Sequence, residues 1–192
     1  MKILTSLLVI DSLNFMNAAQ VSFLQIKAEK KHFGGSLLKN SHAKEKRPIT
    51  VKTPMHLVLR SDIAKGSRSL LNFERRVQKI IYRQGRKFGV KVYRLSNVGN
   101  HLHLIILPRT RRAFQGFIRA ISGLVARAVL RAERGQSRGL KFWDQRPFTR
   151  VISWGRDYAK ACEYLLQNTL EALGFLPYRP RAKSKVLRIA SG

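Results

Sequence analysis

Apolar residues recur along the chain at two spacings, one typical of strands and the other of helices. Short runs rich in apolar and β-branched residues predict strands at residues 55–60, 90–95, 101–107 and 148–153. Apolar residues three and four positions apart predict helices over residues 70–88, 114–128 and 156–173. The resulting order predicts an α+β fold, a ferredoxin-like antiparallel sheet with helices packed on it.

Residues that begin and end regular structure stand where this order needs them. Ser69 can cap the first helix, and Gly89 lies where a helix commonly ends in a left-handed conformation. Asn97-Val98-Gly99-Asn100 predicts a hairpin turn between the two middle strands. Gly174 is expected to close the last helix.

The patterned region is flanked by basic stretches without clear periodicity. Residues 1–47 predict a poorly ordered preamble, residues 48–176 a folded domain and residues 177–192 a basic tail. The apolar start resembles a signal peptide only superficially because Asp11 interrupts it, and a true start at Met16 would explain it equally well. We therefore expect a cytoplasmic protein, associated with the nucleoid, that contains no membrane-spanning segment.

The charge of the chain indicates a polyanionic partner. Its 192 residues include 38 Lys and Arg against 10 Asp and Glu, a formal net charge of +28. Hydrophobic residues make up 44%, which excludes a disordered basic tail. The field favours nucleic acid as the partner, followed by an anionic membrane surface. The one cysteine, Cys162, excludes an intrachain disulfide and a cysteine-rich zinc site.

His101-Leu102-His103 is the first candidate for chemistry. Side chains alternate along a strand, so both histidines would lie on one face, within reach of one divalent cation. Taken alone, the motif fits two structural histidines as well as it fits a metal site.

The last predicted helix supplies a tyrosine. At 100° per residue, Tyr164 falls on a polar side, and Asn168 lies one turn further on. The opposite side is expected to face the core; it carries Tyr158, Cys162, Leu165, Leu166, Thr169, Leu170 and Leu173. An ordinary surface tyrosine is the alternative, while Tyr82 and Tyr93 are interpreted as structural.

A histidine pair, an exposed tyrosine and a positive field together suggest one reaction. A cation would polarise a phosphodiester, and the tyrosine would attack it and become attached to DNA. A free phenol has a pKa near ~10, so the cation or nearby Lys and Arg would have to help it lose its proton. No nucleotide cofactor is needed.

Three ordered segments resemble the single-tyrosine HUH transposases, closest to the REP-associated tyrosine transposases and the transposases of single-strand insertion sequences. They are Asn100-His101-Leu102-His103, the stretch from Phe142-Trp143 to Val151-Ile152, and Glu163-Tyr164-Leu165-Leu166-Gln167-Asn168. The resemblance covers roughly residues 50 to 176 and makes residues 48–176 an HUH-like catalytic domain. The chain departs from the family by Val98-Gly99 before the histidine motif and by Asn168-Thr169 after the tyrosine, where the family often has Met-Pro and Asn-Pro.

The resemblance implies an enzyme that cuts and rejoins single-stranded DNA. His101 and His103 would hold Mg²⁺ or Mn²⁺, with Asn168 as a third ligand, and Tyr164 would form a 5′-phosphotyrosine link. It also implies recognition of DNA hairpins and a homodimer, in which Tyr164 and the histidines come either from one subunit or from different subunits.

Basic residues after the histidine strand are interpreted as a DNA track that begins near the metal. They are Arg109, Arg111, Arg112 and Arg119, with Arg138 in a later loop. Phe142 and Trp143 could stack on bases, although a core role for at least one is the simpler interpretation.

Two other functions fit parts of the sequence. A catalytically silent protein that binds DNA or RNA hairpins explains the composition equally well. A membrane-surface protein is less favoured, because the apolar stripes alternate with strands instead of forming one long amphipathic helix.

Overall fold

The computed structural model describes residues 31–38, 45–132 and 140–178, which belong to one compact unit that begins at Lys31. The preceding unit, residues 1–30, lies outside the described residues. So do residues 39–44, 133–139 and 179–192.

Five antiparallel strands form one sheet in the order β1-β5-β2-β4-β3. The last four have the ferredoxin-like arrangement, so the predicted fold class is confirmed. The strands are β1 (His32–Phe33), β2 (Met55–Arg60), β3 (Val90–Asn97), β4 (His101–Pro108) and β5 (Phe148–Val151). The helices are α2 (Glu74–Phe88), α3 (Arg111–Leu130) and α4 (Arg156–Ala172).

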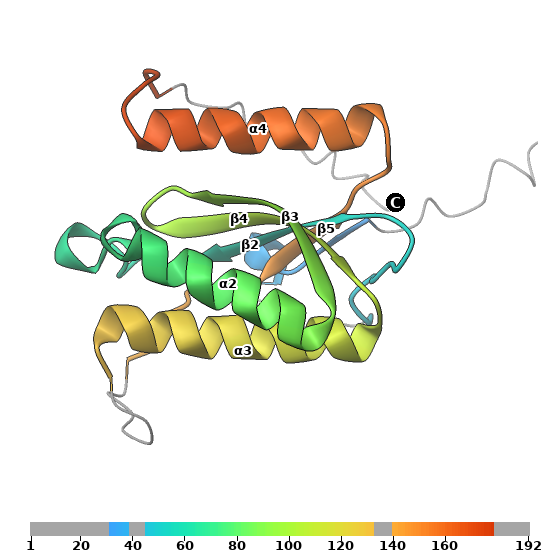
Figure 1. Ribbon diagram of the computed structural model, residues 1–192, viewed down its shortest axis with the longest axis horizontal. Coiled ribbons are helices and arrows are strands. Elements are labelled where there is room, and N and C mark those ends of the chain that lie inside the picture. The colour runs from blue at the N-terminus through green and yellow to red at the C-terminus, as the bar shows by residue number, and fades with distance from the viewer. Residues whose placement is uncertain (1–30, 39–44, 133–139, 179–192) are drawn as a thin grey trace, which may run out of the picture. The chain divides into compact units, whose positions relative to one another are not determined.

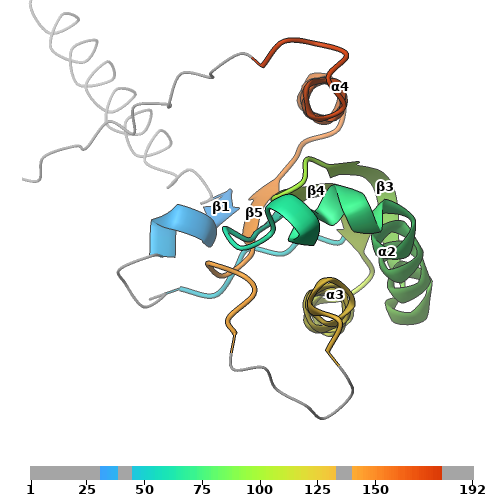
Figure 2. The same cartoon turned by 90° about the vertical axis from the view of Figure 1, so that its left-hand side faces the viewer.

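The two faces of the sheet carry different helices. α2 and α3 cover one face and α4 lies over the other, as the end-on view makes clear (Figures 1 and 2). The face toward α2 and α3 is apolar and belongs to the main core, with Leu57, Leu102, Leu104 and Ile106 fully buried. The face toward α4 belongs to a smaller cluster, in which Ile105 and Ile152 are buried against Ala161 and Leu165 of α4.

The predicted helix ends are close to the observed ones. The Ser69 side chain accepts a hydrogen bond from the Leu71 amide, and a short 3₁₀ turn (Leu70–Phe73) leads into α2. Gly89 ends α2 in the left-handed region, at φ 67°. A side chain there would be strained, and its Cβ would meet the Arg109 side chain at 3.4 Å.

The predicted orientation of the last helix is right for Leu165, Tyr158 and Cys162 but wrong for Tyr164, which was expected on the opposite side. Ala161, Leu165 and Asn168 face the sheet, and Tyr164 packs on the same side. Leu166 and Leu173, expected in the core, are 60% and 55% exposed. The hydrophobic pattern misleads here because the sheet under α4 presents histidine and serine side chains, so the helix turns aromatic and polar residues toward it.

Part of the predicted preamble belongs to the sheet. β1 pairs with β5, and the Arg47 guanidinium lies 4.5 Å above the Phe33 ring centroid and donates to Thr149 Oγ1 at 2.8 Å. A two-residue strand carries too little pattern to be found by periodicity, which is why a boundary at residue 47 was expected. Two parts of the predicted preamble, residues 1–30 and 39–44, lie outside the described residues.

By length and composition alone, α3 could cross a membrane. The sequence was expected to contain no segment of this kind. The buried residues of α3 include Phe114, Phe117, Ile121 and Val125, and all four pack in the main core. The burial of this face explains the apolar composition of α3 without a bilayer.

Candidate active site

The two histidines of the predicted motif lie side by side at the start of β4. Leu102 between them is fully buried on the opposite face of the sheet. The ring centroids of His101 and His103 are 4.6 Å apart, and the ring planes are inclined by 65°. The alternation of a strand thus places both imidazoles on one face of the sheet, as predicted, and this is the face that α4 covers.

A third histidine, His56, joins them from β2 and was missed by the sequence reasoning. β2 and β4 pair with Val58 opposite His103, which places His56 diagonally next to His103 on the same face. The two rings are stacked with centroids 5.3 Å apart, and both side chains are buried. A histidine inside the apolar run Met55–Leu59 was the available signal.

Hydrogen bonds orient the two motif histidines. His101 Nδ1 lies 2.6 Å from Asn100 Oδ1, and His103 Nδ1 lies 3.1 Å from His56 Nε2. An amide oxygen only accepts, so neutral His101 carries its proton on Nδ1 and its lone pair on Nε2. His103 has the same tautomer when it donates to His56. In both cases Nε2 is then the nitrogen able to bind a cation.

Burial keeps two of the histidines neutral. Desolvation lowers the pKa of His56 to about 4, and the nearby Arg150 charge adds to the effect. Desolvation lowers the pKa of His101 to about 4 as well, with a smaller contribution from Arg60. Neutral imidazoles can act as metal ligands and hydrogen-bond acceptors, which protonated ones cannot.

Tyr164 meets these histidines from α4. Its ring lies edge-on to His103, with centroids 5.6 Å apart and planes inclined by 81°, and edge-on to His56 at 6.0 Å. Asn168 follows one turn later and is buried. The structure therefore brings Tyr164, Asn168 and the histidine pair together within one chain.

Polar contacts near both ends of α4 hold it on the sheet. Thr169 Oγ1 donates to Ser96 Oγ of β3 at 2.8 Å. At the other end of the helix, Arg150 of β5 pairs with Asp157 at 2.8 Å, and Asp157 also accepts the Ser153 amide at 3.0 Å. Together with the small cluster around Leu165, these bonds fix the position of Tyr164.

A pocket of about 480 Å³ opens beside the tyrosine. It lies between the β3–β4 turn, α4 and the residues after α4, and it is open to solvent. His101, Tyr164 and Asn168 line it together with Val98, Asn100, Glu171, Ala172 and Tyr178. A strand of DNA could reach the tyrosine and the first histidine from this side.

The donor set fits a divalent cation with two nitrogen ligands. Within the described ranges, no three His, Cys, Asp or Glu side chains are grouped as a metal site. His101 and His103 would contribute two oriented imidazoles, and the remaining ligands would be oxygens from Asn168, water or phosphate. His56 sits behind His103 and would then be the hydrogen-bond partner of that ligand, a common arrangement in metal sites.

The predicted DNA-binding arginines do not lie near the histidines. His103 lies near the start of β4 and Arg109 follows its last residue, six residues or about 20 Å away at the usual rise of a strand. Arg111, Arg112 and Arg119 are exposed on α3, which covers the other face of the sheet. The predicted DNA track therefore does not begin at the histidine pair, because the histidines lie at the start of β4 and Arg109 follows its other end. Arg138 lies outside the described residues.

Phe142 and Trp143 have structural roles. Phe142 is buried in the main core, and Trp143 packs against that core and donates its indole N–H to the Ser122 carbonyl at 2.9 Å. The core interpretation of these two residues is therefore the better one.

Comparison with known proteins identifies the family and the fold. Residues 50–168 match the family described as transposase, IS200 like. One solved structure, of a REP-associated tyrosine transposase bound to a REP hairpin, has a TM-score of 0.54 at 17% identity over 70% of this chain and 76% of that one. A second, of a proposed transposase from Deinococcus radiodurans R1, has a TM-score of 0.40 at 15% identity over 66% of this chain and 98% of that one. Among curated proteins none matches.

The family match spans the described domain from the residues before β2 to Asn168, and so includes the three histidines and Tyr164. The first of the solved structures shares the fold of the sheet and helices. A chain with this match over more than half its length is a member of the IS200-like transposase family.

Proposed function

We propose that this protein cuts and rejoins single-stranded DNA through a covalent link to Tyr164. The observation that carries the proposal is the placement of the Tyr164 ring against His103 and His56, beside an open pocket that His101 and Asn168 also line. Membership of a transposase family supports the same reaction class.

In the proposed reaction Tyr164 is the nucleophile. The Tyr164 oxygen attacks the phosphorus of a DNA phosphodiester, the bond to the 3′ oxygen breaks, and that oxygen takes up a proton as a 3′ hydroxyl. The product is a 5′-phosphotyrosine, and attack by another 3′ hydroxyl reverses the step and restores the tyrosine. His101 and His103 would hold Mg²⁺ or Mn²⁺, which supplies charge stabilisation at the phosphate when bound. No nucleotide cofactor takes part.

The substrate we propose is single-stranded DNA that forms a hairpin. The support is the structure of a REP-associated tyrosine transposase bound to a REP hairpin, which shares this fold. We further propose a homodimer in the cytoplasm; the contacts within one chain already bring Tyr164 to the histidines, so cleavage in cis needs no exchange of α4.

The test is a covalent adduct on a denaturing gel after incubation with hairpin-bearing single-stranded DNA and Mn²⁺ or Mg²⁺. We expect an adduct with the wild type and none with Tyr164→Phe. Tyr82→Phe is the matched control, since Tyr82 lies on α2 and is 41% exposed. Absence of an adduct with the wild type, or an equal adduct with Tyr164→Phe, contradicts the proposal.

A silent hairpin-binding protein is the second candidate. The distribution of charge favours it, because the exposed arginines of α3 lie on the face of the sheet away from Tyr164. It predicts that His101→Ala and Tyr164→Phe leave DNA binding and all other function unchanged. Loss of the exposed α3 arginines should abolish DNA binding and the function that depends on it.

A further inference from the structure

Three aromatic rings gather at the N-terminal end of α4, away from the pocket beside Tyr164. Tyr93, Trp154 and Tyr158, here called the aromatic cluster, have ring centroids 5.1 to 5.9 Å apart. Trp154 is 48% exposed, and the other two are partly exposed. A half-exposed tryptophan that contacts two tyrosines presents a broad apolar surface to solvent.

The local backbone builds this surface. The pairing of β3 with β4 shifts register between Val92 and Arg94, which leaves Tyr93 as an extra residue in the strand. Trp154 stands in the connection between β5 and α4, and its indole N–H donates to the Lys52 carbonyl at 2.9 Å. That bond holds the edge of the indole, while half of the residue surface stays exposed.

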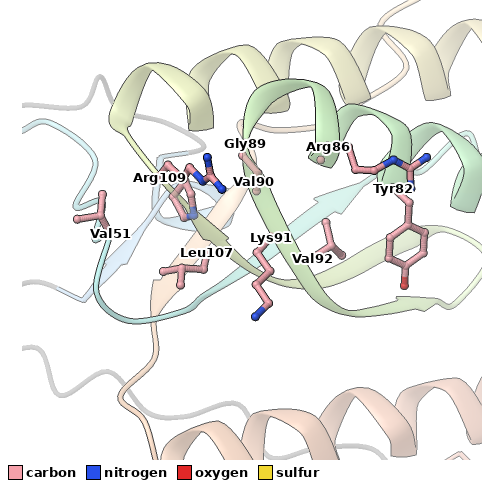
Figure 3. A pocket seen from close by; sticks show the side chains of 11 residues that line it. Val51, Tyr82, Arg86, Gly89, Val90, Lys91, Val92, Leu107 and Arg109 are labelled. Atoms are coloured by element: carbon pink, nitrogen blue, oxygen red, sulfur yellow. The ribbon is translucent and has the colours of Figure 1, made fainter.

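Positive charge surrounds the aromatic cluster. Lys91 Nζ lies 4.8 Å from the Tyr93 ring centroid, and Arg94 is exposed beside it. Lys91 also lines a second pocket, of about 600 Å³, with Arg86 and Arg109; Figure 3 shows the three cations around it. No carboxylate lines this pocket among the described residues. Asp157, close to Tyr158 in sequence, is paired with Arg150.

We propose that unpaired bases of single-stranded DNA stack on the aromatic cluster, which serves them as a platform. The adjoining phosphates would contact Lys91 and then Arg86 and Arg109. The proposal rests on the proposed function, since it takes the same DNA strand as the ligand. It adds a second contact site: Tyr158 and Tyr164 are six residues apart, about 9 Å along the helix axis. Stacking on rings tolerates any base, whereas lysine and arginine alone would recognise only the backbone.

Tryptophan fluorescence tests the platform in the absence of cleavage. The full chain with a chelator is titrated with a single-stranded dT oligonucleotide, and we expect quenching that is lost in Trp154→Phe. Trp154→Ala should weaken the affinity roughly five- to one-hundred-fold, the range for one stacked base. Leu166→Ala removes a 60% exposed apolar side chain of α4 that lines neither pocket and should leave the affinity unchanged.

An abasic oligonucleotide of equal length provides the decisive comparison. It keeps the phosphates and lacks the bases, so platform stacking predicts weaker binding to the wild type and no further loss with Trp154→Ala. Equal affinity of wild type and Trp154→Ala for dT, or equal quenching in Trp154→Phe, overturns the proposal. If Trp154→Ala does not fold, judged by circular dichroism, the quenching in Trp154→Phe and the abasic oligonucleotide decide alone.

Adduct formation separates this inference from the proposed function. If Trp154 proves not to bind bases but the Tyr164 adduct still forms, the proposal of a second contact site is wrong and the proposed enzymatic function stands. Base-dependent quenching without any adduct retains the platform and removes the enzymatic proposal.

Discussion

His56 is the residue that most changes the picture of the site. It is buried on β2, its Nε2 lies 3.1 Å from His103 Nδ1, and its ring touches the edge of Tyr164. It therefore connects a proposed metal ligand with the proposed nucleophile, although it is positioned to bind neither DNA nor the cation directly. We interpret it as a positioning residue for His103.

Replacing His56 should weaken cation binding. His56→Gln removes the ring stacked on His103, so the orientation of His103 is less fixed. Partners of metal ligands typically contribute 10- to 100-fold to metal affinity or activity. We expect a roughly tenfold or larger rise in the Mn²⁺ concentration that gives half-maximal adduct, with near-normal yield at saturating Mn²⁺. His32→Gln on β1 is the control, and an equal shift in both variants would contradict a specific role for His56.

Stability should fall in mild acid because of the buried histidines. The pKa of His56 and that of His101 are lowered from 6.5 to about 4, so between these values the unfolded chain binds protons that the folded chain does not. The free energy of unfolding then decreases as the pH drops from about 6.5 to about 4, by on the order of 1 to 3 kcal/mol for each group, and these two groups add nothing further below that. Urea unfolding of the metal-free protein at pH 7.5 and pH 5 measures the difference, which His56→Gln should reduce. An unchanged difference in that variant would mean that other groups cause it.

At the scale of elements, α4 is the least firmly packed helix of the described domain. α2 and α3 bury their apolar faces in the main core, whereas α4 packs in a smaller cluster, where its Ala161 and Leu165 are buried against Ile105 and Ile152. Buried apolar surface supplies most of the stability of a helix in a protein, so α4 should open more readily than the other two. A nucleophile carried on such a helix depends on its docking.

Two core substitutions should separate docking of α4 from stability of the domain. Leu165→Ala removes part of the small cluster under α4, and we expect faster amide hydrogen exchange in α4 and at least a tenfold loss of adduct. Phe117→Ala in the main core should lower the stability of the whole domain by about 3 to 5 kcal/mol. If Leu165→Ala instead accelerates exchange equally in α2, α3 and α4, the helix is not an independent unit.

At the scale of the whole molecule, the charge is spread over both faces of the sheet. A net charge of +28 draws DNA to the protein without selecting a surface. Arg109 lines the pocket next to the aromatic cluster, while Arg119 is exposed on α3 on the other face. These two arginines can therefore show which face the DNA follows.

Salt dependence of binding should distinguish the two faces. Each phosphate contact to a single strand contributes roughly 0.7 to the slope of log affinity against log salt. We expect Arg109→Gln to reduce the slope by about that amount and Arg119→Gln to leave it unchanged, measured by fluorescence anisotropy with a chelator present. The reverse result would place the DNA on the α3 face.

Much of the fold was predictable from local pattern. The strand Met55–Arg60, the hairpin after Val90, the left-handed Gly89 and the order of elements were all expected, because alternation, helical spacing and turn residues act over a few positions. The motif His101-Leu102-His103 was predictable for the same reason. β1 and the exposed Trp154 were not, since a two-residue strand and an isolated ring carry no periodic signal.

The sequence by itself therefore determined the α+β class, the histidine pair on one face of a strand, and the charge that attracts nucleic acid. Only the tertiary structure decided which side of α4 meets the sheet, that His56 stands behind His103, and that Arg109 lies at the far end of β4. The physical reason is that periodicity tells apolar from polar faces but not what lies opposite them. Here the pairing of β2 with β4 brings His56 next to His103, and the packing of α4 on that histidine-bearing face adds Tyr164.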